Sequence, residues 1–415
     1  MTHDTNIPQG YKATALGIIP QEWEVMRLGD IVSITSGESP SLYHLKAEGK
    51  YPYVKVEDLN NCEKYQESSR EYSDDNNTTI KAGSIIFPKR GASILNNKVR
   101  IAAKDIQMDS NMMAITPHTA IVDTEFLYIR ILHERLYRIA DTSSIPQINN
   151  KHIIPYKIAV PPLAEQRKIA EVLGVWDEAI EKQARLIEKL ALRKRGLMQR
   201  LLSAKLRLPG FSEPWQKVKL GDIGDTYNGL SGKNKDDFEY GNAQFIPYIN
   251  VFSNERIDTN NLGCVQIKPN EQQNTVKYGD IFFTVSSETP DEVGMASVLL
   301  EHLDNTYLNS FCFGYRLNNF STLNPFFAAY LFRTEHFRNY MSVLAQGSTR
   351  FNISKKEVMK LKIDLPTIEE QTSIAEVLTA ADREIELAKE KLERLRRQKR
   401  GLMQQLLTGK KRIKY

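Results

Sequence analysis

The chain has 415 residues, of which 41% are hydrophobic and 26% are charged, and its formal net charge is +5 at pH 7. These values are typical of a globular protein with two to four domains, and no apolar run approaches the ~20 residues of a membrane-spanning helix. The cysteines are widely separated, at Cys62, Cys264 and Cys312. They form no metal or disulfide framework, so we expect a cytoplasmic protein with reduced thiols and no membrane partner.

The first half of the chain is predicted to contain an arm, a domain and a long helix. Residues 1–21 are polar and proline-containing, which favours an extended arm. Residues 22–161 are predicted to form a globular domain that ends at a proline pair. Short apolar runs bounded by turn residues predict strands at 51–56, 84–87 and 99–102, and a helix is predicted at 126–139. A long helix is then predicted for residues 162–205.

The second half repeats this order after a linker at 206–212. It is predicted to contain a globular domain at 213–366, a long helix at 367–409 and a basic tail at 410–415. Within the domain, strands are predicted at 245–251, 280–285 and 296–299, and a helix at 325–341. Both domains open on similar strings, Trp23-Glu-Val-Met-Arg-Leu-Gly-Asp-Ile31 and Trp215-Gln-Lys-Val-Lys-Leu-Gly-Asp-Ile223. The sequence therefore predicts two similar halves joined end to end.

The two long helices are the clearest part of this repeat. Residues 165–202 align without a gap with residues 370–407, at an offset of 205, and 20 of the 38 positions are identical. Apolar residues recur in steps of three and four in each copy, which is the period of a coiled-coil seam. The nearest partner for each helix is the other copy, although pairing with other chains remains an alternative. Lys194 and Lys399 occupy the same seam position and are candidates for setting the register.

Polar loops in both domains are candidates for contacts with double-stranded DNA. Lysine and arginine neutralise phosphates, arginine reaches guanine edges, and asparagine and glutamine can pair with adenine. In the first domain the candidates are Lys89, Arg90, Ser93, Asn96, Asn97, Lys98, Arg100, Gln147 and Asn149. In the second they are Ser231, Lys233, Asn234, Lys235, Ser286, Ser287, Thr349, Arg350 and Asn352. The alternative for each single loop is an ordinary solvated turn.

The sequence contains no convincing catalytic motif. It has no GxxxxGK[ST] phosphate loop, no HExxH pair and no GxSxG elbow. Asn324-Pro-Phe-Phe327 resembles the tetrapeptide with which adenine methyltransferases hold a flipped base. A helix start explains it better, because asparagine is a good N-cap and proline suits the first helical position. We therefore expect a chain without catalytic residues and without a cofactor or metal of its own.

The order of these parts and several strings together resemble the specificity subunits of Type I restriction–modification enzymes. The strings are the two Leu-Gly-Asp-Ile domain openings, the Ile-Ala-Glu-Val-Leu segments early in the long helices, and the Lys-Arg-Gly-Leu-Met-Gln segments that close them. The resemblance covers essentially the whole chain. Each string alone is weak, and the combination is specific.

The resemblance implies an α+β fold in which two target-recognition domains are separated by two long helices. The helices would form an antiparallel intramolecular coiled coil within a pseudo-twofold internal repeat. Each domain would read one half of an asymmetric, bipartite DNA target. The helices would set the gap between the halves and dock two DNA adenine-N6 methyltransferase subunits. S-adenosylmethionine would be bound by those subunits, and ATP and Mg by restriction/translocase subunits.

A nuclease or methyltransferase acting alone is a rival class, although the missing motifs argue against it. Two further alternatives remain open at this stage. One is the specificity subunit of a related system whose partner is a fused nuclease–methyltransferase. The other is a coiled-coil adaptor that binds proteins and reads no DNA.

Overall fold

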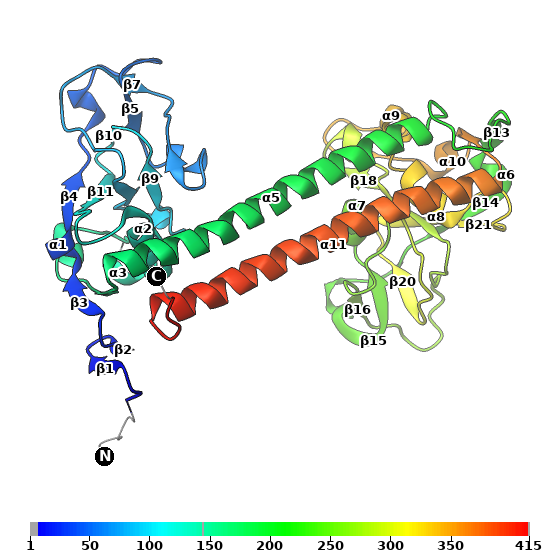
Figure 1. Cartoon of the computed structure of the whole chain (residues 1–415). Helices are drawn as coiled ribbons and strands as arrows, with labels where there is room; N and C mark the ends of the chain where they lie inside the picture. The colour runs from blue at the N-terminus through cyan, green and yellow to red at the C-terminus, as the bar shows by residue number, and fades with distance from the viewer. Residues whose placement is uncertain (1–6, 143–144, 414–415) are drawn as a thin grey trace. The chain divides into compact units, whose positions relative to one another are not determined.

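The computed structural model describes residues 7–142 and 145–413, so residues 1–6 of the predicted arm and 414–415 of the predicted tail lie outside the described residues. The chain divides into two compact units. Unit 1 comprises Met1–Ala184 with Glu390–Tyr415, and unit 2 comprises Arg185–Lys389. Each unit contains part of both long helices, α5 (Leu163–Leu201) and α11 (Ile368–Leu407) (Figure 1).

Unit 1 is built on a mixed sheet with the strand order β4-β11-β8-β9-β6. Its strands are β4 (Val32–Ser36), β11 (Met112–Pro117), β8 (Ile85–Pro88), β9 (Arg100–Ala102) and β6 (Tyr65–Gln66). Alternate residues of a strand point to opposite faces, so β8 contributes to two cores. Ile85 and Phe87 pack with helix α2 (Thr124–Glu134), while Ile86 faces a smaller core that includes Val54. That second core lies against the sheet β10-β5-β7, formed by Gln107–Met108, Tyr51–Val54 and Tyr72–Ser73.

Unit 2 repeats this construction with an antiparallel sheet in the order β14-β21-β17-β19. Its strands are β14 (Gly224–Asn228), β21 (Cys312–Leu317), β17 (Ile281–Thr284) and β19 (Ala296–Val298). Ile281 and Phe283 face the main core, and Phe282 faces the second one. The accompanying sheet has the order β16-β15-β20, formed by Gly263–Val265, Phe238–Ile246 and Thr306–Leu308.

A two-stranded ribbon connects each unit to its long helix. In unit 1, β3 (Glu24–Arg27) pairs with β12 (Lys157–Val160), and in unit 2, β13 (Gln216–Lys219) pairs with β23 (Lys362–Leu365). Four short helices follow or precede these strands, namely α1 (Leu28–Ile31), α4 (Asn150–Ile153), α6 (Leu220–Ile223) and α10 (Lys355–Val358). In each unit the last strand of the ribbon leads directly into a long helix, β12 into α5 and β23 into α11.

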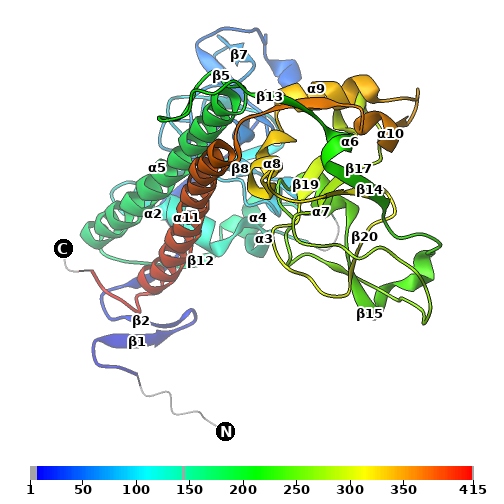
Figure 2. The ribbon, with the colours of Figure 1, turned by 90° about the vertical axis from the view of Figure 1, so that its right-hand side faces the viewer.

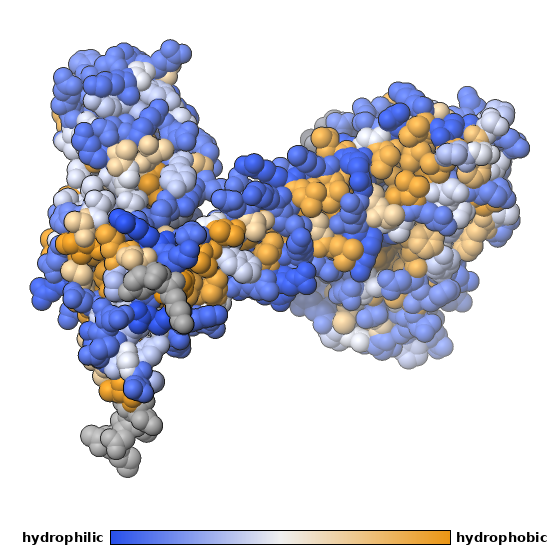
Figure 3. Space-filling model, viewed as in Figure 1, coloured by the Kyte–Doolittle hydropathy of each residue, from blue (hydrophilic) through white to orange (hydrophobic). Residues whose placement is uncertain are grey.

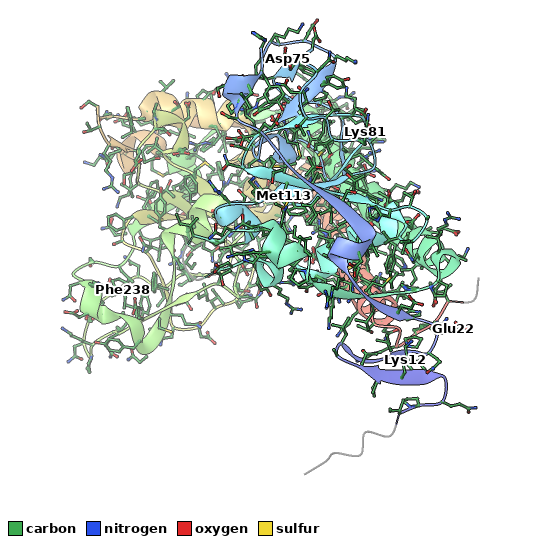
Figure 4. The ribbon with its side chains drawn as sticks, turned by 90° about the vertical axis from the view of Figure 1, so that its left-hand side faces the viewer. Lys12, Glu22, Asp75, Lys81, Met113 and Phe238 are labelled. Carbon is green, nitrogen blue, oxygen red and sulfur yellow. The ribbon has the colours of Figure 1, made fainter. Side chains whose placement is uncertain are left out.

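Part of the predicted extended arm is a hairpin, which corrects that expectation. Strand β1 (Tyr11–Thr14) pairs antiparallel with β2 (Gly17–Pro20), and Figure 4 labels Lys12 on this hairpin. The Tyr11 hydroxyl donates to the carbonyl of Gly409 over 2.9 Å, so the hairpin lies against the end of α11 within unit 1.

Three predicted elements differ from the structure. The helix predicted at 126–139 is divided into α2 and α3 (Leu136–Ile139) at Arg135, whose φ is 64°. The helix predicted at 325–341 is divided into α8 (Pro325–Leu331) and α9 (Glu335–Leu344), because Thr334 caps a new helix start. The strand predicted at 245–251 was wrong beyond residue 246. Pro247 has no N–H for a strand ladder, and α7 (Tyr248–Ser253) begins directly after it.

The two long helices pair within each unit, and the views agree that they run side by side (Figures 1 and 2). In unit 1, Leu173 shares a core with Leu406, and further along α5 Asp177 forms an ion pair with Lys399. In unit 2, Leu201 shares a core with Ile374 and Leu378, and the seam residue Lys194 pairs with Asp382 at 2.7 Å. In these contacts, higher residue numbers on α5 meet lower residue numbers on α11. This order confirms that the two helices pair antiparallel and within one chain in each unit.

The residues that follow each long helix contact the first turn of the other long helix. Glu165 near the start of α5 is fully buried and accepts from Trp23 Nε1 at 3.0 Å and from Arg412 Nε at 2.7 Å. In unit 2, the buried Glu370 near the start of α11 accepts from Arg207 Nε at 2.6 Å. Arg207 and Glu165 lie 205 positions before Arg412 and Glu370, so the repeat makes the same ion pair twice.

Candidate nucleic-acid interface

Separate loops of unit 1 meet at the end of strand β8. The Lys89 N–H donates to the carbonyl of Asn111 over 2.8 Å, and the Ile148 N–H donates to the carbonyl of Lys89 over 2.9 Å. Because these backbone bonds tie together segments far apart in the sequence, the loops present one continuous edge. We call residues 37–42, 89–97, 109–111 and 145–149 the loop edge of unit 1.

Unit 2 builds the same edge from the equivalent segments. The Val285 N–H donates to the carbonyl of Phe311 over 2.9 Å, and the Ile353 N–H donates to the carbonyl of Val285 over 3.0 Å. Strand β18 (Ser286–Ser287) also pairs here with β22 (Phe351–Asn352). We call residues 229–235, 285–292, 309–311 and 346–353 the loop edge of unit 2.

The remaining loop of each edge reaches its neighbours through a glycine. A Cβ on Gly37 would overlap the carbonyl oxygen of Asp109, and a Cβ on Gly229 would overlap that of Asn309. Only a residue without a side chain permits this close approach of two backbones. The two glycines stand in equivalent positions, 192 residues apart.

Two of the candidates in unit 1 are exposed at its loop edge. Arg90 and Asn96 are exposed, and the backbone of Arg90 pairs with that of Gln147. Burial, together with the neighbouring Arg90, lowers the pKa of Lys89. The other candidates, Ser93, Lys98 and Asn149, are half-buried. Of these, Lys98 donates to Asn60 Oδ1 over 2.7 Å, and Asn149 is the N-cap residue of α4.

Two candidates of unit 1 have structural roles instead, which corrects the prediction. Asn97 has a φ of 51°, and its side chain donates to the carbonyl of Leu132 over 3.0 Å and accepts from the Leu136 N–H at 2.9 Å. Arg100 donates to three backbone carbonyls, among them Cys62 and Leu59 at 2.8 Å each. These hydrogen bonds give both side chains a structural role inside the fold.

The loop edge of unit 2 exposes six of its candidates, which are Ser231, Asn234, Lys235, Thr349, Arg350 and Asn352. The Arg350 guanidinium lies 6.0 Å from the ring centroid of Phe311, and 55% of Phe311 is exposed. Phe311 and Lys355, which donates to Asn228, were not among the predicted residues. An exposed phenylalanine cannot be told from its buried neighbour Phe313 by sequence alone.

Three candidates of unit 2 are buried, which corrects the prediction for them as well. The side chain of Lys233 is 3% exposed and pairs with Glu271 at 2.6 Å. Ser286 and Ser287 are 6% and 9% exposed, and their backbones form the short β18–β22 ladder. Burial removes all three side chains from contact with a large ligand.

The comparison with protein families shows which family the chain belongs to. A family model described as the Type I restriction modification DNA specificity domain matches residues 20–191 and again residues 212–397. Together these two matches cover most of the chain, one in each half.

The chain belongs to this family.

Relatives of this specificity family align with nearly the full chain. The MjaVIII specificity subunit of Methanocaldococcus jannaschii is 26% identical and covers 95% of this chain and 94% of its own. The putative MjaX specificity subunit of the same organism is also 26% identical, with 98% and 97% covered. A specificity subunit is therefore the kind of protein that the chain is similar to along its whole length.

Solved structures of the family show the same fold. The S subunit of a Type I system from M. genitalium has a TM-score of 0.54 at 17% identity, with 98% of both chains covered. The HsdS subunit of Thermoanaerobacter tengcongensis has a TM-score of 0.52 at 19% identity, with 94% of this chain and 98% of that one covered. A chain from a study of the assembly of a type I R-M system has a TM-score of 0.64 at 20% identity, over 94% and 99%.

The methyltransferase-like tetrapeptide of this specificity-family chain is a helix start. Asn324 Oδ1 accepts from the Phe326 N–H at 2.8 Å, and the Asn324 amide donates to Thr372 Oγ1 over 3.0 Å. These bonds fix the N-terminus of α8, as the sequence predicted. In the described part of the chain, no helix combines the length and apolar character needed to span a membrane.

Proposed function

We propose that the chain is the DNA-reading subunit of a Type I restriction–modification enzyme, in which each unit reads one half of an asymmetric, bipartite target. One observation carries this proposal. Both units build the same loop edge from equivalent segments and place different side chains on it, such as Arg90 in unit 1 and Arg350 in unit 2. Two domains that recognise different base sequences need a shared backbone arrangement that carries different side chains at the contact positions.

The accessible side chains suit direct readout of the major groove. Arginine can bond to both acceptors of guanine, and the amides of Asn96 and Asn352 can pair with adenine. Phosphate contacts contribute most of the affinity and its salt dependence, while base contacts contribute the discrimination. Within this proposal, the chain selects the site and performs no bond-breaking step.

The partners we propose are two DNA adenine-N6 methyltransferase subunits and ATP-dependent restriction subunits, which would bind S-adenosylmethionine, ATP and Mg. Apolar residues on the outside of α5 support a docking role. Val175, Leu186 and Leu192 are 63%, 44% and 66% exposed, and Figure 3 shows apolar patches among the polar residues of this helix. Exposed apolar side chains on a paired helix provide area that a partner can bury.

Substitution of one arginine in each loop edge tests the two-reader proposal. In the complex with the methyltransferase subunits, Arg90→Ala should relax the sequence required at one position in one half of the methylated site. Arg350→Ala should relax a position in the other half. Loss of one bidentate base contact costs about 1–3 kcal/mol. Methylome sequencing of cells that carry each variant measures both effects.

The matched control is Arg138→Ala, which removes an exposed arginine of α3 outside both loop edges and should leave the methylated site unchanged. Relaxation of the same half by both Arg90→Ala and Arg350→Ala would refute the assignment of one half-site to each unit. Assembled complexes with no sequence preference would instead support the adaptor alternative. A co-purifying partner with both nuclease and methyltransferase activity would identify the related system.

The isolated chain should bind no S-adenosylmethionine. Its sequence lacks the glycine-rich cofactor segment of methyltransferases, and the tetrapeptide at Asn324 is used to cap a helix. Isothermal titration calorimetry of the purified chain should show no heat of binding, whereas the complex with its methyltransferase subunits should show saturable binding. Saturable binding by the chain alone would contradict the proposed division of labour.

A further inference from the structure

Each ribbon carries two cations directly opposite each other. Arg27 of β3 is the register partner of Lys157 in β12, and Lys219 of β13 is the register partner of Lys362 in β23. Directly opposed residues of an antiparallel pair project from the same face, where like charges repel and destabilise the pairing. Both units nevertheless place a cation pair at the same position of the same ribbon.

A third cation lies close to each pair. Lys151 of α4 and Lys356 of α10 are equivalent, because they stand 205 positions apart, as do Lys157 and Lys362. The backbone holds these segments together. The Gly29 N–H donates to the carbonyl of Ile154 over 3.2 Å in unit 1, and the Gly221 N–H donates to that of Met359 over 2.9 Å in unit 2. We call the sets Arg27, Lys151, Lys157 and Lys219, Lys356, Lys362 the cation triads of units 1 and 2.

In unit 2 two members of the triad, Lys219 and Lys356, line a surface depression. It has a volume of about 280 Å³ and is lined by Lys219, Thr226, Lys355, Lys356 and Lys360 among others. Of these lysines, Lys360 has an ion-pair partner, Glu357, at 2.7 Å. Among the described residues, no member of either triad forms an ion pair with a carboxylate, and all six are exposed or half-exposed. Unpaired like charges around a hollow point to an anion that is supplied from outside.

The triads adjoin the loop edges. Lys151 follows two residues after Asn149, where the loop edge of unit 1 ends. In unit 2, the neighbour of Lys356, Lys355, donates to Asn228 at the base of the loop edge. A duplex lying on either loop edge would therefore bring its backbone close to the triad of that unit.

We propose that the two cation triads are contacts for the phosphates of the DNA backbone, one triad in each unit. This inference rests on the proposed function and adds a second class of contact beside the base-reading edges. Phosphates are the same in every sequence, and lysine binds them without base discrimination. Two domains that read different bases can therefore keep identical phosphate contacts, which explains why the triads agree while the loop edges differ.

The two units differ in the number of positive charges beside the triad. Unit 2 adds Lys355, which forms no ion pair among the described residues, at the position where unit 1 has Asn150. More cations on one side predict that unit 2 contributes more of the salt-dependent affinity than unit 1.

Double variants of the ribbon pairs test the proposal in the complex with the methyltransferase subunits. Arg27→Ala/Lys157→Ala and Lys219→Ala/Lys362→Ala should each weaken binding to a cognate duplex and to an unrelated duplex by the same factor, about tenfold at 0.1 M salt. Each lost phosphate contact reduces the magnitude of the slope of log K against log salt by about 0.9, so loss of each pair should reduce that magnitude by about 2. The methylated sequence should stay unchanged.

The control removes two positive charges that belong to neither triad and neither loop edge. Lys104 and Lys277 are exposed and precede the strands β10 and β17, so Lys104→Ala/Lys277→Ala should leave the slope almost unchanged. Removal of a like-charge pair should leave the melting temperature equal or higher, which separates weaker binding from unfolding. The variant Lys219→Arg/Lys362→Arg should retain the salt slope.

An unchanged salt slope in both ribbon variants would overturn the proposal. Loss of methyltransferase subunits from the complex would overturn it in favour of an acidic protein partner, and a changed methylated sequence would assign these residues to base reading. Failure of the proposed function has a separate signature, since the wild-type complex would then bind cognate and unrelated duplexes equally. In that case the slopes of the ribbon variants still decide whether the triads contact phosphate.

Discussion

Replacement of Arg412 with alanine is expected to lower the free energy of unfolding by about 3 kcal/mol, the lower end of what breaking a buried ion pair costs. Glu165 is fully buried, and Arg412 donates to both of its carboxylate oxygens, at 2.7 and 2.9 Å. Without Arg412, the described residues leave the Trp23 indole, at 3.0 Å, as the donor to this carboxylate. Arg412 is 30% exposed, so water can partly replace it, which is why we expect the lower figure.

Urea denaturation measures this effect. The sample is either the complex of the chain with its partners or the full chain, in which the unfolding of unit 1 is followed. Lys411→Ala is the matched control, because it removes an exposed positive charge from the neighbouring residue and should have almost no effect. Arg412→Lys should lie between the two, since lysine restores the charge and loses the second hydrogen bond. Equal stability of Arg412→Ala and Lys411→Ala would show that the tail does not hold the start of α5.

Lengthening of both long helices is expected to widen the gap between the two half-sites of the DNA target. Ala184 is the last residue of unit 1 on α5, and Lys389 is the last residue of unit 2 on α11. Four residues inserted after Ala184 lengthen α5 by about 6 Å at 1.5 Å per residue. A matching insertion after Lys389 lengthens α11 equally and keeps the pairs Lys194–Asp382 and Asp177–Lys399 intact within their units.

The gap should increase by one or two base pairs, because DNA rises ~3.4 Å per base pair. The smaller increase is favoured for helices that lie obliquely to the DNA. Four residues also turn a helix slightly more than once, so the rotation of the following domain should be modest. The half-sites themselves should not change, since neither loop edge is altered. Methylome sequencing of cells carrying the double-insertion variant measures the gap and the half-sites together.

Insertion into α5 alone is the informative control. It shifts the seam of one helix against the other by four residues, and four is not a heptad, so stability should fall. An unchanged gap in the double-insertion variant would show that the helices do not set the spacing. Altered half-sites would show that the two units do not read DNA independently.

The long helices could be predicted from the sequence because their pattern is local and sustained. The heptad positions of α5 and α11 repeat over five heptads, and residues such as Leu173 and Leu378 are buried as that pattern predicts. Only tertiary contacts showed how the seam lysines are paired. Lys194 and Lys399 each meet an aspartate of the other helix, more than 180 residues away in the chain.

Short elements were less predictable because neighbouring residues alone do not determine them. The apolar run at 245–251 looks like one strand, yet α7 occupies most of it. Asn250 is buried there, and its amide donates to the carbonyls of Asp258 and Asn261 over 2.9 Å. Such a bonding site exists only once the following loop has folded back.

The sequence by itself determined that the chain is a duplicated frame with two variable domains, because repeat length and apolar period are properties of the chain alone. Only the tertiary structure decided which loop side chains are available to DNA. Lys233 and Lys235 lie two residues apart in the same polar loop, and Lys235 is exposed. The Lys233 side chain is buried instead, where it pairs with Glu271, 38 residues further along the chain. Accessibility depends on such distant partners, and no local pattern encodes them.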